Sequence, residues 1–124
     1  MKGQIDFESM PWEDTPYSRV YVSCLKEGKH FSVHAVRLDA GGEIRLHYHE
    51  REDEWTEMFF FPRGGQFEFR RRDAPKEYSG PTLVCESIAP REVYGIRNTD
   101  SSPLYFLSMM KPGFTGFGEI VPVE

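Results

Sequence analysis

The stretch Gly41-Gly-Glu-Ile-Arg-Leu-His47-Tyr-His49 holds two histidines separated by one residue. If it is a β-strand, both histidines project from the same face, because alternate side chains of a strand share a face. A tight connection and an antiparallel strand beginning near Glu57 would place a carboxylate across from the pair, within about 5 Å. Two imidazoles and one carboxylate leave coordination positions open on a metal. The stretch therefore predicts a metal site that can also take a small ligand.

Composition places the chain among small soluble proteins. Its 124 residues suit one domain, so we expect residues 1–124 to form a single unit. The formal net charge of −5 argues against a nucleic-acid partner. The sequence has neither an apolar run that could span a bilayer nor a signal-peptide pattern, and we expect a cytoplasmic protein without a membrane partner. Cys24 and Cys85 are far apart in the sequence, which favours two free thiols.

The pattern along the chain is that of an all-β protein. Short segments rich in β-branched and aromatic residues alternate with Gly, Pro, Asp and Asn, and no helical period is sustained. Eight strands at this spacing suit a jelly roll with a ligand mouth between its sheets. We expect a turn at Arg63-Gly-Gly. The expected strands are 18–25, 30–38, 44–49, 57–62, 66–71, 82–88, 93–98 and 104–110.

These motifs resemble those of the cupin superfamily. Its members are small double-stranded β-helix (jelly-roll) barrels with a metal at the centre. The first cupin motif is glycine, five residues, His-x-His, three or four residues, glutamate, six residues, glycine. Gly41 to His49 matches its first half, and Glu57 to Gly64 matches its second. The interval between His49 and Glu57 is longer, at seven residues. Glu54 keeps the family's spacing from His49 but not its spacing to a glycine, so we expect Glu57 to be the carboxylate ligand.

The second cupin motif is matched only in part. In Ala89-Pro-Arg-Glu-Val-Tyr94-Gly-Ile-Arg-Asn98 the asparagine holds its place, but Tyr94 stands where the third histidine ligand would be. A phenol, with a usual pKa of about 10, binds a metal well only when it ionises. Three outcomes are open: a divalent metal held by His47, His49 and Glu57 alone, a metal with Tyr94 as fourth ligand, or no metal. The sequence does not distinguish Fe, Mn, Ni and Zn.

Other residues have two readings each. Arg45 shares the parity of the histidines, so it is expected either to bind an anionic substrate in the same cavity or to pair with nearby acids at the barrel mouth. His34 either reaches the cavity as a substrate-binding group or packs against an aromatic ring.

Residues 1–17 are expected to form an extended arm. The run Met58-Phe-Phe-Phe61 lacks strand alternation, so both its faces should be covered, and we expect a homodimer.

The resemblance implies a small-molecule enzyme acting on an oxygen-rich or anionic metabolite. Two mechanisms compete, with Tyr94 as the expected catalytic acid or base. A dioxygenase would offer Fe(II) to O2 and to a chelating substrate. A Lewis-acid metal would instead support an isomerase, lyase, cyclase or decarboxylase. A non-catalytic small-molecule sensor or binding module is the third possibility.

Overall fold

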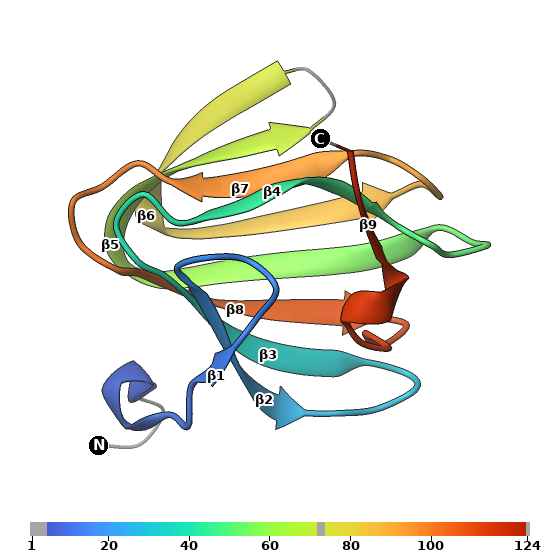
Figure 1. The fold of residues 1–124 in the computed structure, drawn as a ribbon, viewed down its shortest axis with the longest axis horizontal. Helices are drawn as coiled ribbons and strands as arrows, with labels where there is room; N and C mark the ends of the chain where they lie inside the picture. The colour runs from blue at the N-terminus through green and yellow to red at the C-terminus, as the bar shows by residue number, and fades with distance from the viewer. Residues whose placement is uncertain (1–4, 72–73, 124) are drawn as a thin grey trace.

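The structure is a computed structural model that describes residues 5–71 and 74–123. The all-β prediction is confirmed, since the regular elements here are strands and two short 3-10 turns (Figure 1). No helix in this part of the chain is long and apolar enough to cross a membrane. In chain order the elements are η1 (Phe7–Ser9), β1 (Glu13–Asp14), β2 (Val20–Lys26), β3 (Ser32–Leu38), β4 (Glu43–His49), β5 (Trp55–Arg71), β6 (Ala74–Ile88), β7 (Tyr94–Asn98), β8 (Leu104–Lys111), η2 (Phe117–Glu119) and β9 (Ile120–Pro122).

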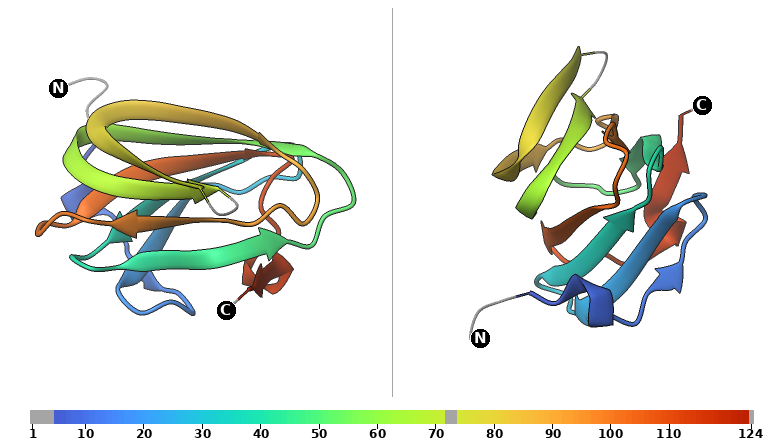
Figure 2. Two further views of the ribbon diagram at one scale, coloured as in Figure 1. Left: turned by 90° about the horizontal axis from the view of Figure 1, so that it is seen from above. Right: turned by 90° about the vertical axis from the view of Figure 1, so that its left-hand side faces the viewer.

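The strands form one antiparallel sheet that curls into two facing layers, as the two views of Figure 2 show. Its order is β1-β2-β3-β8-β5-β7-β4-β9, with β6 paired to β5. β5 belongs to both layers: its residues 56–60 pair with β8, and its residues 67–71 pair with β7. The sheet therefore turns its corner within this single strand.

The expected turn at Arg63-Gly-Gly is wrong. The two strands predicted on either side of it are one continuous strand, β5, and the predicted strand 82–88 is the second half of β6. The pairing of β5 with β6 is irregular between Phe61 and Gly65, which marks a bulge. Bulges bend and twist a strand without ending it. Gly65, with φ 146°, supplies the backbone conformation that this corner needs.

The interior of the barrel has a packed end and an open end. At the packed end, Phe61 stacks on Phe67 with ring centroids 3.9 Å apart, and Phe106 packs against Phe61 at 4.7 Å. The buried side chain of Asn98 closes this end by donating to the carbonyl oxygens of Leu38, Asp39 and Ser102. The opposite end carries the first residues of β5 and β7 and the last residues of β4 and β8. Here the layers enclose a cavity instead of a solid core.

The outer face of the sheet is partly covered by the amino-terminal residues. Phe7 is fully buried and stacks on Tyr105 of β8, while β1 pairs with β2. On β6, Leu83 is 56% exposed and is the cross-strand neighbour of Phe60. The predicted homodimer would cover this apolar surface, and it stays a prediction.

Candidate active site

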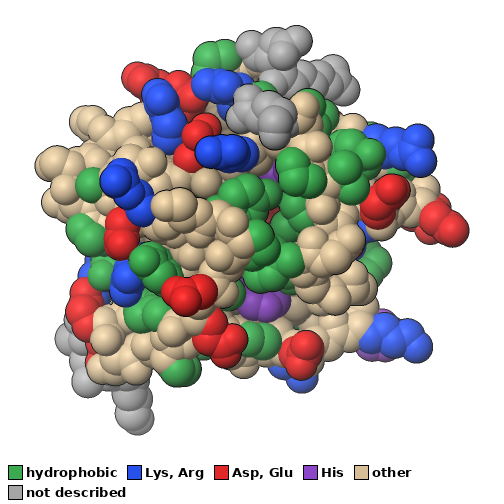
Figure 3. Space-filling view, in the orientation of Figure 1, with side chains coloured by type: hydrophobic (Ala, Val, Ile, Leu, Met, Phe, Trp, Pro, Cys, Tyr) green, Lys and Arg blue, Asp and Glu red, His purple; other side chains and the backbone are tan. Residues whose placement is uncertain are grey.

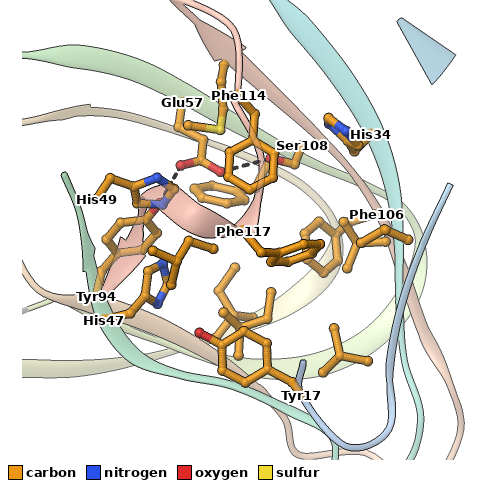
Figure 4. Close-up of a pocket in the computed structure, with 18 residues that line it drawn as sticks. Tyr17, His34, His47, His49, Glu57, Tyr94, Phe106, Ser108, Phe114 and Phe117 are labelled. Carbon is orange, nitrogen blue, oxygen red and sulfur yellow. Dashed lines mark hydrogen bonds between the residues drawn. The ribbon is translucent and has the colours of Figure 1, made fainter. Parts of the chain in front are cut away.

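Four side chains singled out from the sequence meet at the open end of the barrel (Figure 4). His47 and His49 come from the end of β4, Glu57 from the start of β5, and Tyr94 from the first residue of β7. Each is at most 5% exposed. The strand register explains the meeting, because His47 is the cross-strand partner of Tyr94. Gly95 allows the close approach of the two strands, since a Cβ there would lie 2.7 Å from the carbonyl oxygen of Ile44.

Apart from these groups, the cavity is mostly apolar. The space between the walls is about 710 Å³ when the open mouth is included. Figure 3 shows hydrophobic side chains gathered at the centre of one face, with histidine visible among them. Within residues 5–71 and 74–123, no lysine or arginine lines the cavity. The lining residues are Tyr17, Val20, Val22, His34, Val36, Ile44, His47, His49, Glu57, Phe59, Tyr94, Ile96, Phe106, Ser108, Met110, Phe114, Phe117 and Ile120.

His47 is fixed by its own strand. Its Nδ1 lies 2.7 Å from the carbonyl oxygen of Arg45. A carbonyl can only accept, so Nδ1 carries the hydrogen and Nε2 keeps a lone pair. Burial lowers the pKa of His47 from 6.5 to about 4. His47 is therefore neutral near pH 7 and presents a hydrogen-bond acceptor.

His49 is fixed by a distant residue. Its Nδ1 is hydrogen-bonded to the carboxylate of Glu119, which lies in η2 and is 7% exposed. The same carboxylate accepts hydrogen bonds from Arg51 at 2.8 and 3.2 Å. Burial alone would raise the pKa of Glu119, but the bonds from His49, Arg51 and Thr115 hold that pKa well below its usual range. Glu119 is thus an ionised partner for the imidazole.

Tyr94 links the histidine to the second carboxyl group. Its Oη lies 3.0 Å from Nε2 of His49 and donates to Oε1 of Glu57 at 2.5 Å. Ser108 donates to the other oxygen of Glu57 at 2.8 Å. Burial raises the pKa of Glu57, and burial together with the Glu57 carboxyl raises the pKa of Tyr94. The phenol therefore keeps its proton inside the cavity.

The structure places His34 both at the cavity and against an aromatic ring. Its side chain lines the cavity and makes an edge contact with Phe114, with ring centroids 5.6 Å apart. Arg45 does not line the cavity, and the expectation based on its parity is wrong. The register of β4 shifts between Ile44 and His47, and as a result both Ile44 and His47 face the cavity. Arg45, between them, points outward and lines a separate surface groove. A role of either residue in substrate binding stays a prediction.

The position of the two candidate acids agrees with the expected choice between them. Glu57 lies in the cavity, whereas Glu54 is exposed in the connection before β5.

The sequence did not point to Glu119 or Arg51. No spacing rule joins residue 49 to residue 119, because their contact depends on the return of the chain after β8. The sequence signal for Glu119 was its place as an acid inside the aromatic and glycine-rich closing segment, residues 112–122.

The donor set does not fit a metal ion in this arrangement. Two of the three expected ligands, His49 and Glu57, are already bonded to the Tyr94 hydroxyl. Among residues 5–71 and 74–123, no three His, Cys, Asp or Glu side chains are grouped so that they could hold one ion.

Comparison with solved structures identifies the architecture. The polyketide cyclase RemF from Streptomyces resistomycificus superposes with a TM-score of 0.73 at 14% identity, over 100% of this chain and 87% of that one. An RmlC-like cupin from Shewanella frigidimarina gives a TM-score of 0.71 at 14% identity, over 94% of this chain and 96% of that one. The chain has a cupin fold.

A third cupin neighbour is a sugar phosphate isomerase from Silicibacter pomeroyi, with a TM-score of 0.68 at 16% identity, over 87% of this chain and 74% of that one. No model of a known protein family matches the sequence, and no curated protein matches it. At these identities the cupin likeness concerns the fold. It supports the resemblance seen in the two sequence motifs, and the chemistry has to be argued from the site.

Proposed function

We propose that this cupin is a small-molecule enzyme that moves a proton on a largely apolar substrate. The observation that carries the proposal is the Tyr94 hydroxyl, held between Glu57 and His49 inside an apolar cavity. Hydrogen-bonded acids and bases with shifted pKa values are typical of catalytic sites. The reaction class is an isomerisation, cyclisation or related lyase reaction that begins with loss of a proton next to a carbonyl group.

The cavity chemistry narrows the substrate. Its walls are mainly Val, Ile, Phe and Met side chains, and in the part of the chain that the structure describes no lysine or arginine lines it to neutralise an anion. An oxygen-rich or anionic metabolite, as expected from the family resemblance, is therefore a poorer match than an aromatic body with one neutral oxygen function. Among the structural neighbours, the polyketide cyclase aligns along the whole of this chain, which supports a cyclisation as the reaction class.

Each polar group at the open end has a role in this proposal. Glu57, held by the donor Ser108, takes a proton from the substrate carbon once the Tyr94 hydroxyl turns from Glu57 to the substrate oxygen. Tyr94 presents its hydroxyl to the developing oxyanion, where a donor in apolar surroundings acts most strongly. The free Nε2 of His47 accepts a hydrogen bond from a substrate hydroxyl.

A metal-dependent enzyme, either a dioxygenase or a Lewis-acid isomerase, lyase or decarboxylase, is the second candidate. It has one supporting observation: Nδ1 of His47 and of His49 each bind an acceptor outside the cavity, as metal-binding histidines usually do. This candidate requires the Tyr94 hydroxyl to release both of its partners.

The test uses 2-tetralone, an apolar aromatic ketone with acidic hydrogens beside its carbonyl. The wild-type protein should accelerate exchange of these hydrogens for deuterium in D2O, followed by NMR. Tyr94→Phe and Glu57→Gln should each slow the exchange by about a hundredfold, the effect of losing a positioned acid or base. The matched control is Tyr48→Phe, on the outward face of β4 between the two histidines, which should leave the rate unchanged.

Three outcomes would overturn the proposal. Binding of 2-tetralone without exchange would favour the sensor or binding module. Exchange that stops with chelator, together with a stoichiometric metal that disappears in the His47→Ala, His49→Ala variant, would favour the metal-dependent enzyme. Competition by 2-naphthoate at a similar concentration would contradict the choice of a neutral substrate.

A further inference from the structure

His34 is a polar side chain of the cavity that the proposed proton transfer does not use. It points inward from β3, and the next inward residue of that strand, Val36, is apolar. Its ring is half-buried and makes an edge contact with Phe114. Figure 4 shows His34 on the opposite side of the cavity from His47 and Tyr94. The apolar wall therefore carries a polar group that is separate from the cluster around Tyr94.

The hydrogen-bonding capacity of His34 is not used by the protein. Among residues 5–71 and 74–123, its ring nitrogens have no hydrogen-bond partner, and Phe114 offers an apolar contact alone. In contrast, Nδ1 of His47 and of His49 each bind a protein oxygen. Polar groups that are taken out of water without a partner cost free energy, and most of them in native proteins have one. The nitrogens of His34 are therefore available to a molecule bound in the cavity.

The charge state of His34 indicates which group it can bind. Burial lowers its pKa from the ordinary 6.5, and the negative charge of Glu27 opposes that shift. A neutral imidazole has one nitrogen that donates and one that accepts. A hydroxyl group can do either, so it suits both tautomers of His34. An anionic group suits this place less well, because Glu27 is negative.

The strand order sets the span between His34 and the proposed base. His34 is the cross-strand partner of Ser108 on β8, and Ser108 donates to Glu57 on β5. β3, β8 and β5 are successive strands of the sheet, so β3 and β5 lie roughly 10 Å apart. One polar atom of a ligand cannot reach both His34 and Glu57. A two-ring aromatic ketone with a hydroxyl group at the end remote from its carbonyl can span them.

We propose that His34 is a specificity-determining residue that selects substrates with an uncharged hydroxyl group at the end remote from the reacting carbonyl. The placement of the carbonyl rests on the proposed function, in which it meets Tyr94. His34 then binds the remote hydroxyl, and the apolar walls enclose the rings between the two ends. Two fixed points orient the substrate, so that the C–H bond beside its carbonyl is presented to Glu57.

The first test compares 2-tetralone, 6-hydroxy-2-tetralone and 7-hydroxy-2-tetralone by calorimetry. At least one hydroxylated ketone should bind the wild type about fivefold more tightly than 2-tetralone, the usual effect of one neutral hydrogen bond. His34→Phe keeps a ring against Phe114 and removes the nitrogens, so it should lose this preference and bind 2-tetralone as the wild type does. The matched control is His30→Phe, at an exposed histidine before β3, which should keep the preference.

Nitrogen-15 NMR of the wild-type protein gives a second reading, which does not depend on the folding of any variant. The ring signals of His34 should move further with the preferred hydroxylated ketone than with 2-tetralone, and those of His30 should move with neither. The inference would be overturned by no gain in affinity for either hydroxylated ketone, by a preference that persists in His34→Phe, or by an equal loss of affinity for all three ligands in that variant. Lack of 2-tetralone exchange in the wild type would count against the proposed function alone, because these readings measure binding.

Discussion

His47 and His49 are two residues apart on one face of β4, yet different parts of the chain hold them in place. His47 is fixed by the backbone carbonyl of Arg45, within its own strand. His49 is fixed by Glu119 and Tyr94, which are 70 and 45 residues away. The first imidazole needs only the local strand, whereas the second needs the completed fold. A short motif can therefore supply two equivalent side chains and leave their chemical states to be decided by distant contacts.

The largest loss of stability should come from removing Arg51, which binds the Glu119 carboxylate that holds His49. Arg51→Met removes the donors to Glu119 and to the carbonyl oxygens of Pro112 and Gly113. The ion pair is largely buried, with side chains 12% and 5% exposed, and removing its cation should cost about 4 kcal/mol. Urea unfolding measures this loss. Hydrogen exchange should show faster opening of residues 112–122, and equal acceleration throughout the barrel would contradict a local role.

A smaller effect, on the pH dependence of protein stability, should distinguish His47 from His49. Its pKa is about 4 in the folded protein and 6.5 ordinarily, so between these values the unfolded chain binds a proton that the folded one does not. Stability therefore falls as the pH decreases from 6.5 to 4, by about 3 kcal/mol in all. His47→Gln should lack this contribution. Parallel stability curves for the wild type and the variant would show that burial does not hold His47 neutral.

The smallest effect should come from the side chain of Arg45. It is exposed outside the cavity, while its backbone carbonyl holds His47. Arg45→Ala keeps that carbonyl and should change the free energy of unfolding by less than about 0.5 kcal/mol. Exchange of 2-tetralone should be unaffected. A clear fall in the exchange rate would mean that the guanidinium reaches the substrate from the neighbouring groove.

Local patterns predicted those parts of the molecule that local geometry decides. The all-β class, the strand ending at His49, the shared face of the two histidines and the preference for Glu57 over Glu54 all follow from spacing and alternation. Arg45 was misplaced because simple alternation does not allow for the register shift that precedes His47. The turn at Arg63-Gly-Gly was misread for a similar reason, since glycines also accompany bulges inside a strand.

The contacts of Tyr94 and Glu119 depend on tertiary structure. The second motif indicated that Tyr94 faces the site, but not that its hydroxyl would join Glu57 to His49. Arg51 lies in the longer interval between His49 and Glu57, where the sequence departs from the cupin spacing. That interval was interpreted as a polar insertion, and in the structure it supplies the cation that binds Glu119. A departure from a family pattern was thus informative about the site, although its sequence alone did not reveal the partner.

The continuous strand β5 also bears on the order in which the protein folds. β5 and β6 are neighbours in sequence and pair along most of their length, so their hairpin closes only a short loop. The bond between His49 and Glu119 closes a loop of 70 residues and gains nothing until the barrel exists. The hairpin therefore belongs to the early steps of folding and the closing segment, residues 112–122, to the last. Chains halted before that final step would have a formed barrel in which His47 is already held by its own strand while His49 still lacks its contact with Glu119.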